Sequence, residues 1–99
     1  MDFDRVIHEP ARLRIMMILA GVASADFKFL RNTLGLTKGN LSSHMDRLER
    51  SGYVAITKSF NGKMPHTIYK LTKPGQTALD SYWTQLDEIR NLNASGAKK

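Results

Sequence analysis

The first half of the chain alternates between apolar stripes at helical spacing and small polar residues that start or stop helices. Between Pro10 and Ala20, apolar side chains recur at steps of three and four residues, which predicts a helix closed by Gly21. A second stripe covers residues 27–34 and follows Asp26, whose carboxylate can cap a helix. The pattern therefore predicts two short helices joined by a brief connection.

The segment from Leu36 to Val54 contains the most informative pattern. Leu41, Met45 and Leu48 fall on one face of a helix, which predicts a thin apolar seam directed at the core. The opposite arc is small, polar or charged, and consists of Gly39, Asn40, Ser43, Asp46, Arg47 and Arg50. A helix of this kind presents a hydrogen-bonding and cationic surface to a partner.

After Gly52 the pattern changes to runs of β-branched and aromatic residues. Residues 53–60 and 67–71 predict two antiparallel strands. Asn61-Gly62 is a strong signal for a hairpin turn between them, since both residues tolerate positive φ. Pro65 is expected in the connecting loop, where its missing N–H costs no ladder bond.

A long helix is predicted over residues 72–94, and residues 95–99 are predicted to be a frayed tail. The apolar stripe of this helix is longer and more aromatic than a small core needs. Folding back over its own domain would leave Tyr82 or Trp83 exposed, so we favour packing against the same helix of a second copy. The residues expected to make that contact are Leu79, Tyr82, Trp83, Leu86 and Ile89.

Composition narrows the class of protein. The 99 residues suit one domain, and the absence of cysteine excludes disulfides and cysteine-ligated metal sites. The chain shows neither a signal-peptide pattern nor an apolar run of the roughly 18 residues that a membrane span needs, so a cytoplasmic location is expected. We expect no metal and no cofactor.

Positive charge is concentrated in the middle of the chain. The net charge is +6, and residues 28–74 contain nine Lys or Arg but only two acids. The first 27 residues have three bases and four acids, and the last 25 have three of each. Binding to a polyanion needs such a localised excess, because phosphate attraction and counterion release supply the sequence-independent affinity.

The order helix, helix, turn, helix, basic hairpin and long helix is that of a winged helix-turn-helix domain, a mainly α fold with a small antiparallel β-hairpin (α+β). The sequence resembles the winged-helix regulators related to the MarR and ArsR families, especially their short archaeal and bacterial one-domain members. The pieces that carry the resemblance are Pro10–Met16, Asp26–Leu30, Leu36–Met45, Leu48–Val54, Pro65–Thr67 and Leu71–Gly75.

The resemblance implies a single domain over residues 1–99, in which 9–71 form the helix-turn-helix and wing and 72–94 form the dimerisation helix. It also implies a homodimer whose third helices enter successive major grooves of double-stranded DNA, with the wings on the flanking backbone or minor groove. A two-fold dimer predicts a pseudo-palindromic operator with half-sites about one helical turn apart. The implied function is sequence-specific transcriptional regulation, as a repressor.

The third helix contains the principal candidates for DNA contact. Free N–H groups and the helix dipole favour phosphate at its first turn, which Thr37 is expected to cap and which comprises Thr37, Lys38, Gly39 and Asn40. Asn40 and Ser43 are suited to base edges, and Arg47 to a guanine or a phosphate. Arg50 is expected at phosphate or solvent, paired with Asp46 at i,i+4. His44 lies at the edge of this arc, where packing or capping is at least as plausible as DNA contact.

Backbone contacts are also expected from the second helix and the wing. The candidates are Lys28 and Arg31 on the helix, and Lys58, Lys63, His66 and Lys70 on the wing. Side chains alternate along a strand, so only about half of the wing residues can face DNA together. His66 stands where relatives are more consistently basic, which weakens the contact expected there at neutral pH.

Other classes of function remain as alternatives. An enzyme is disfavoured because His8-Glu9 begins like a zinc-protease motif but lacks the second histidine, and Pro10 interrupts the helix. A winged-helix module that binds protein within a larger complex is the stronger rival, and it should expose an apolar patch on the third helix. A small-molecule effector could bind between the Tyr82/Trp83 helix and the domain.

Overall fold

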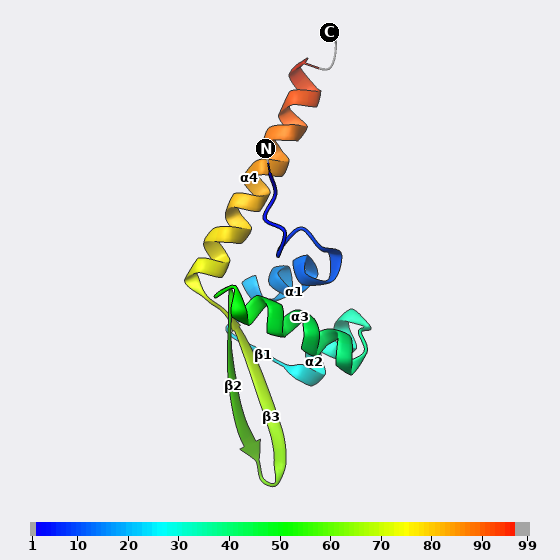
Figure 1. Ribbon diagram of the computed structural model, residues 1–99, viewed down its shortest axis with the longest axis vertical. Coiled ribbons are helices and arrows are strands. Elements are labelled where there is room, and N and C mark those ends of the chain that lie inside the picture. Colours follow the sequence, from blue (N-terminus) through cyan, green and yellow to red (C-terminus); the bar gives the residue numbers. More distant parts are fainter. Residues whose placement is uncertain (1, 97–99) are drawn as a thin grey trace.

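The computed structural model describes residues 2–96. Its elements are α1 (Pro10–Ala20), β1 (Ala25–Asp26), α2 (Phe27–Leu34), α3 (Lys38–Arg50), β2 (Val54–Asn61), β3 (Met64–Leu71) and α4 (Lys73–Gly96). Helices α1, α2 and α3 form the body, the β2–β3 hairpin projects from one end of it, and α4 projects from the opposite end (Figure 1). The chain is therefore elongated, with extents of 64 × 25 × 21 Å.

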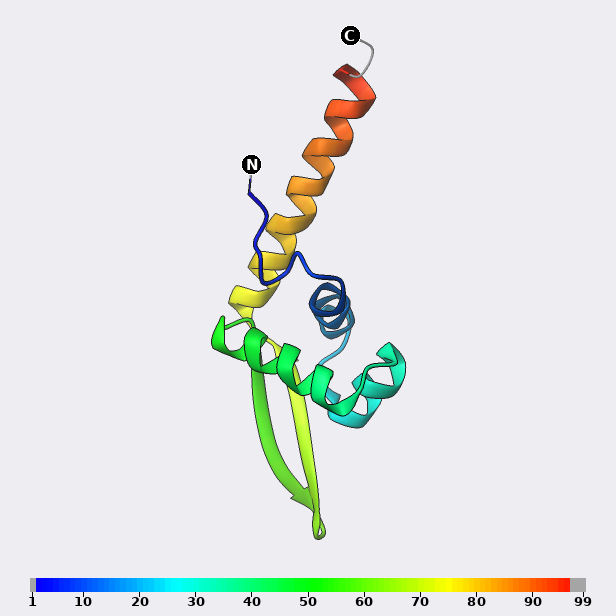
Figure 2. The same cartoon turned by 45° about the vertical axis from the view of Figure 1, so that its right-hand side comes forward.

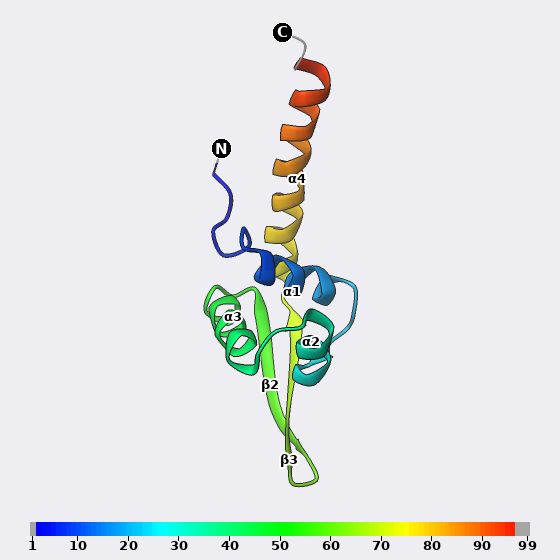
Figure 3. The same cartoon turned by 90° about the vertical axis from the view of Figure 1, so that its right-hand side faces the viewer.

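The core forms around α1, which contacts α2, α3, α4 and β3. Ile15 and Leu19 of α1 are buried, and the predicted seam of α3 (Leu41, Met45 and Leu48) is buried with them in one cluster. The helical spacing read from the sequence is thus confirmed. Burial of this seam turns the opposite face of α3 outward, beside α2 and the hairpin (Figure 3).

The β2–β3 hairpin confirms the two predicted strands but corrects their turn. The strands pair up to Asn61 opposite Met64, so the two-residue turn is Gly62-Lys63 and not Asn61-Gly62. Gly62 adopts a φ of 67°, whereas Lys63 stays at negative φ. Glycine at the first turn position alone is one of the favoured hairpin geometries, so asparagine does not need the left-handed conformation that we assigned to it.

Pro65 lies inside β3, opposite Phe60, and not in the loop expected for it. The pair beside a two-residue turn is hydrogen bonded and pairs then alternate, so Pro65 falls at a non-hydrogen-bonded position. Its missing N–H therefore costs the β2–β3 ladder nothing. The prediction was wrong because it excluded proline from the whole strand, although proline is excluded only where its nitrogen must donate.

A third strand, β1, was not predicted. It pairs with β3 through Ala25 opposite Tyr69 and Asp26 opposite Ile68, which gives an antiparallel sheet in the order β1-β3-β2. Two residues are too few to show strand alternation in a sequence. The capping role expected for Asp26 is present at the same time, since its carboxylate accepts a hydrogen bond from the Phe29 N–H at 2.7 Å.

Helix α4 begins after Thr72 as predicted. The Thr72 hydroxyl accepts from the Gly75 N–H at 3.0 Å and donates to the Gly52 carbonyl at 2.6 Å, so it joins the start of α4 to the end of α3. The helix runs to Gly96, two residues into the tail predicted at 95–99. The rest of that tail, residues 97–99, lies outside the described residues.

The segment before α1 runs between α4 and the body (Figure 2). Phe3 stacks on His8 with ring centroids 4.7 Å apart, both rings lie beside Tyr82, and His8 Nδ1 is 2.8 Å from the Tyr82 hydroxyl. Tyr82 is therefore only 4% exposed, and Leu79 is buried too. These two predicted dimerisation residues belong to the core of their own chain, and N-terminal side chains fill the place where an effector pocket was expected.

Candidate nucleic-acid interface

The first turn of α3 is open to solvent and capped as the sequence predicted. The Thr37 hydroxyl accepts a hydrogen bond from the Asn40 N–H at 3.1 Å. Lys38, Gly39 and Asn40 are all exposed. A Cβ built on Gly39 would meet nothing within 4 Å, so this turn presents an unobstructed backbone. Free N–H groups and the positive end of the helix dipole make it suitable for an anion.

The rest of the outer face of α3 is polar. Ser43, Arg47 and Arg50 are exposed, one below the other along the helix. The Arg50 Nε lies 3.1 Å from a carboxylate oxygen of Asp46, which confirms the predicted i,i+4 pair. An exposed pair of this kind adds little stability, but it offsets the negative charge of Asp46 on a face that is otherwise neutral or cationic.

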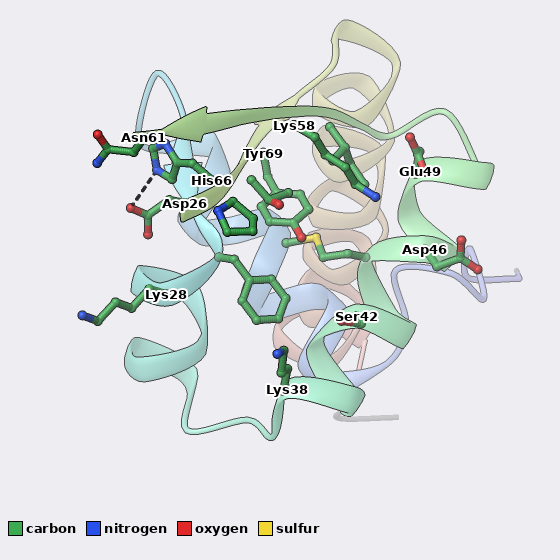
Figure 4. Close-up of a pocket in the computed structure, with 15 residues that line it drawn as sticks. Asp26, Lys28, Lys38, Ser42, Asp46, Glu49, Lys58, Asn61, His66 and Tyr69 are labelled. Carbon is green, nitrogen blue, oxygen red and sulfur yellow. Dashed lines mark hydrogen bonds and ion pairs between the residues drawn. The ribbon is translucent and has the colours of Figure 1, made fainter. Parts of the chain in front are cut away.

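An open groove of about 1020 Å³ lies between α3, α2 and the wing. Three elements each contribute one lysine to its lining, namely Lys28 of α2, Lys38 of α3 and Lys58 of β2 (Figure 4). Ser42 also lines the groove, on a flank of α3 for which the sequence pattern predicted no role. The fold thus brings together cationic residues that are far apart in the sequence.

Carboxylates share this groove, and two of them have partners. The three are Asp26, Asp46 and Glu49. The backbone hydrogen bond from Phe29 is the main reason that the pKa of Asp26 lies below its usual value. Burial opposes this effect, and the hydrogen bond and charge of His66, 3.5 Å away, add to the lowering. Asp46 is paired with Arg50. The negative charge of these two carboxylates is therefore partly offset before any ligand arrives.

The two histidines of the predicted site have partners within the chain. His44 is half-buried, its Nδ1 lies 3.2 Å from an Arg12 guanidinium nitrogen, and a Glu9 carboxylate oxygen lies 4.0 Å away. His66 lies against Asp26 and so connects the wing to the start of α2. In the structure these side chains hold elements together, in contrast to the free, exposed position of Arg47.

The lysines of the wing alternate as expected. Lys58 faces the groove, whereas Lys70, opposite Ala55, lies on the other face of the hairpin. Lys63 stands at the turn. Arg31 is exposed on α2 but is not part of the groove lining. Most of the set predicted from the sequence is thus divided between α3, the groove and the end of the wing, whereas Arg31 and Lys70 lie outside these places.

The arrangement of α2, α3 and the hairpin agrees with a comparison to known families. The family of the winged helix DNA-binding domain matches residues 11–90, most of the chain. The chain belongs to this family. The order of elements described above is that of a winged helix, in which α3 is the recognition helix and the β2–β3 hairpin is the wing.

Two relatives are more than 30% identical to this winged helix protein. The uncharacterized protein MJ0432 of Methanocaldococcus jannaschii is 33% identical over 78 residues, which are 79% of this chain and 85% of that protein. The transcriptional regulator homologue of Pyrococcus horikoshii OT3 has a TM-score of 0.83 and 31% identity, with 89% of this chain and 87% of that chain covered.

A solved regulator of the MarR family, from Enterococcus faecalis V583, shares the fold with a TM-score of 0.76 at 22% identity, covering 96% of this chain and 86% of that chain. Both neighbours are named as transcriptional regulators. Within residues 2–96, no helix combines the length and apolar character needed to cross a membrane. The same residues contain no group of three His, Cys, Asp or Glu side chains that could hold a metal ion.

Proposed function

We propose that this winged helix protein is a homodimeric transcriptional repressor that binds a pseudo-palindromic site in double-stranded DNA. The observation that supports this most strongly is the composition of the outer face of α3. Its exposed positions from Lys38 to Arg50 hold glycine, polar and charged residues, and the large exposed hydrophobic residues of the described chain all lie on other elements. Polar contact with base edges and phosphates suits such a face.

Within the proposed complex, α3 occupies the major groove and its first turn contacts a phosphate through Lys38 and free backbone N–H groups. Asn40 and Arg47 are about two turns apart on the exposed face, within reach of bases a few steps apart. The DNA strand beside the major groove then passes through the groove between α3 and the wing. There the ammonium groups of Lys28 and Lys58 neutralise its phosphates.

Helix α4 supplies the proposed dimer contact. Leu86 is half-buried, and beyond it the helix continues for about 15 Å at 1.5 Å per residue, past the end of the body. Trp83 is exposed just before Leu86, and Ile89 and Leu92 are exposed along the projecting part. Because the body of the same chain does not reach the projecting part, we assign a second copy of α4 as its partner. The two-fold axis of such a dimer relates two copies of α3, one from each chain. By occupying such a site, a dimer would compete with the transcription machinery.

A module that binds protein is the rival function. It would need a partly apolar recognition surface on α3, because the core of a stable protein interface is more apolar and less charged than ordinary surface. The exposed face of α3 lacks this property. The exposed apolar residues of α4 agree with protein contact, but they lie at the opposite end of the molecule from α3 (Figure 1).

A titration of labelled duplex DNA by fluorescence anisotropy tests the assignment of α3. Wild-type protein should bind with an affinity that falls steeply between about 50 and 200 mM salt. Arg47→Ala should weaken binding about tenfold, because it removes a base or phosphate contact. Arg14→Ala is the matched control, since Arg14 is exposed on α1 and donates to the Pro10 carbonyl. Equal loss in both variants, or no salt-dependent binding by the wild type, would contradict the proposal.

Sedimentation equilibrium tests the dimer. The wild type should behave as twice its 11.2 kDa monomer mass. The double variant Ile89→Glu/Leu92→Glu should be monomeric with unchanged circular dichroism, and should lose affinity for DNA. Thr84→Glu places one glutamate on an exposed position of α4 on the side opposite the apolar stripe and should remain dimeric. A monomeric wild type, or a dimer that survives both glutamates, would exclude α4 as the contact.

A further inference from the structure

The end of the wing is unusually apolar. Phe60 is 75% exposed and Met64 is 69% exposed, which makes them the two most exposed large hydrophobic residues of the described chain. Both lie at the end of the hairpin farthest from α4, and Pro65 is beside them (Figure 1). We use the name wing tip for residues 60–65. Side chains of this size are an exposed apolar surface that a partner from outside the chain would cover.

Within residues 2–96, the body covers little of the wing tip: Asn61 and Pro65 line the groove beside α2 and α3, whereas Phe60 and Met64 remain mostly exposed. β1 supports β3 only at Ile68 and Tyr69. From Ile68 to Met64 the hairpin projects about 14 Å, at roughly 3.4 Å per residue, with no third strand beside it. The residue of the hairpin that contacts the body closest to the tip is His66, whose side chain lies against that of Asp26. Among the described residues, Phe60 and Met64 therefore keep most of their apolar surface uncovered.

Both faces of the tip are apolar. Phe60 lies opposite Pro65 on the face that Lys58 also occupies, and Met64 lies opposite Asn61 on the other face. Lys63 stands at the turn between them. The end of the hairpin is thus a narrow wedge, with apolar side chains on its two flanks and a positive charge at its apex.

Charge favours nucleic acid as the partner of this wedge. Residues 54–71 include three lysines and no acidic residue. The hairpin that ends in the tip extends past α2 and α3 (Figure 3), the two helices that line the groove assigned to the DNA backbone. The minor groove beside that backbone is about 6 Å wide, and two paired strands are already about 4.8 Å apart before their side chains are counted. The tip can therefore enter only if the groove opens.

We propose that the wing tip is an apolar wedge that enters the minor groove, inserts Phe60 or Met64 at a base step, and bends the operator. This proposal rests on the proposed function as a DNA-binding regulator. Apolar side chains inserted at a step unstack it and kink the duplex by about 20–90° toward the major groove. The energetic cost of unstacking depends on which two base pairs form the step, and pyrimidine–purine steps unstack most easily. The wing would then select sequence by deformability, without hydrogen bonds to bases.

The experiment uses operator fragments recovered by selection with the wild-type protein. Adenines outside the half-sites are replaced one at a time by 2-aminopurine, whose fluorescence rises on unstacking, and dyes at the two ends report bending. The test variant is Phe60→Thr/Met64→Thr, which keeps residues of high strand propensity. The control is Met17→Gln, which removes an exposed apolar side chain from α1. Lys63→Ala removes the positive charge of the tip but keeps its apolar side chains, so it distinguishes the effect of charge from that of apolar insertion.

Wild type and Met17→Gln should raise the fluorescence at one or two steps and shorten the end-to-end distance. Phe60→Thr/Met64→Thr should lose both signals and about tenfold in affinity with an unchanged salt slope, whereas Lys63→Ala should lower the slope by about one. Tight binding without unstacking, or unstacking that survives in the tip variant, would overturn the wedge alone. If the tip variant instead changed the mass of the assembly that the protein forms without DNA, the wedge would be overturned in favour of a contact between copies of the chain. Absence of all DNA binding would overturn the proposed function as well.

Discussion

Replacement of Gly75 by alanine tests how closely α4 is packed on the connection between α3 and β2. A Cβ at this position would lie 2.2 Å from the Tyr53 carbonyl oxygen and 2.9 Å from a methyl carbon of Leu71. The leucine can rotate away. The carbonyl cannot, because it is backbone between α3 and β2 and accepts a hydrogen bond from the Thr72 N–H at 3.0 Å. The start of α4 must therefore move away from α3.

The magnitude follows from three effects. Overpacking of this kind costs about 1–3 kcal/mol, and loss of the Thr72–Tyr53 hydrogen bond costs about 1 kcal/mol more. The higher helix propensity of alanine returns about 1 kcal/mol. We expect Gly75→Ala to lower the free energy of unfolding by about 1–3 kcal/mol and the melting temperature by about 4–8 °C for each kcal/mol.

Urea unfolding followed by circular dichroism, at one fixed protein concentration, measures this change. Gly39→Ala is the matched control, because Gly39 is also within a helix but a Cβ added there would have nothing within 4 Å of it. It should stabilise the protein by about 0.4–1 kcal/mol. If Gly75→Ala proved as stable as the wild type, the close approach of α4 to the α3–β2 connection would be refuted.

Three other outcomes are expected. The hydrogen bond from the Tyr53 hydroxyl to Asp4 raises the pKa of Tyr53 to about 12, so the folded state favours the neutral phenol and this contribution is lost as the pH rises from 10 to 12. Tyr53→Phe should cost about 1 kcal/mol at neutral pH, and its stability should vary less than that of the wild type across that window in urea titrations. Thr37→Ala should lower stability by about 1 kcal/mol through loss of the α3 cap, whereas Thr37→Ser should retain most of it. Lys58→Ala should reduce the salt slope of DNA binding by about one, and Lys70→Ala, on the other face of the hairpin, should leave it unchanged.

The helices could be predicted from the sequence because each has a local signal. Caps and apolar spacing are written in consecutive residues, so Thr37, Asp26 and the seam of α3 all appear where the pattern placed them. β1 has no such signal, since a two-residue strand is defined by its partner in β3. Tyr82 was assigned to a dimer for the same reason, because the contact that buries it comes from Phe3 and His8, more than 70 residues away in sequence.

The candidate site was predicted in its chemistry but not in its geometry. Residue type and position on a helical wheel were sufficient to predict that Arg47 and the first turn of α3 are exposed. They did not show that His44 faces Arg12, because a histidine at the edge of an arc turns toward whichever neighbour the fold supplies. The groove likewise depends on tertiary structure, since its lysines come from three elements. The apolar tip was passed over because Phe60 matches an ordinary strand pattern and Met64 falls in the loop predicted between the two strands.

Selection of bound fragments from random double-stranded DNA by the purified protein tests the central claim most directly. The proposal of a two-fold dimer that reads bases with α3 predicts that the recovered fragments share two inverted half-sites, with centres about 10–10.5 base pairs apart. Arg47→Ala should recover the same spacing with a relaxed preference at one position in each half-site. Recovery of no common sequence, or of a single unrepeated half-site, would contradict the claim.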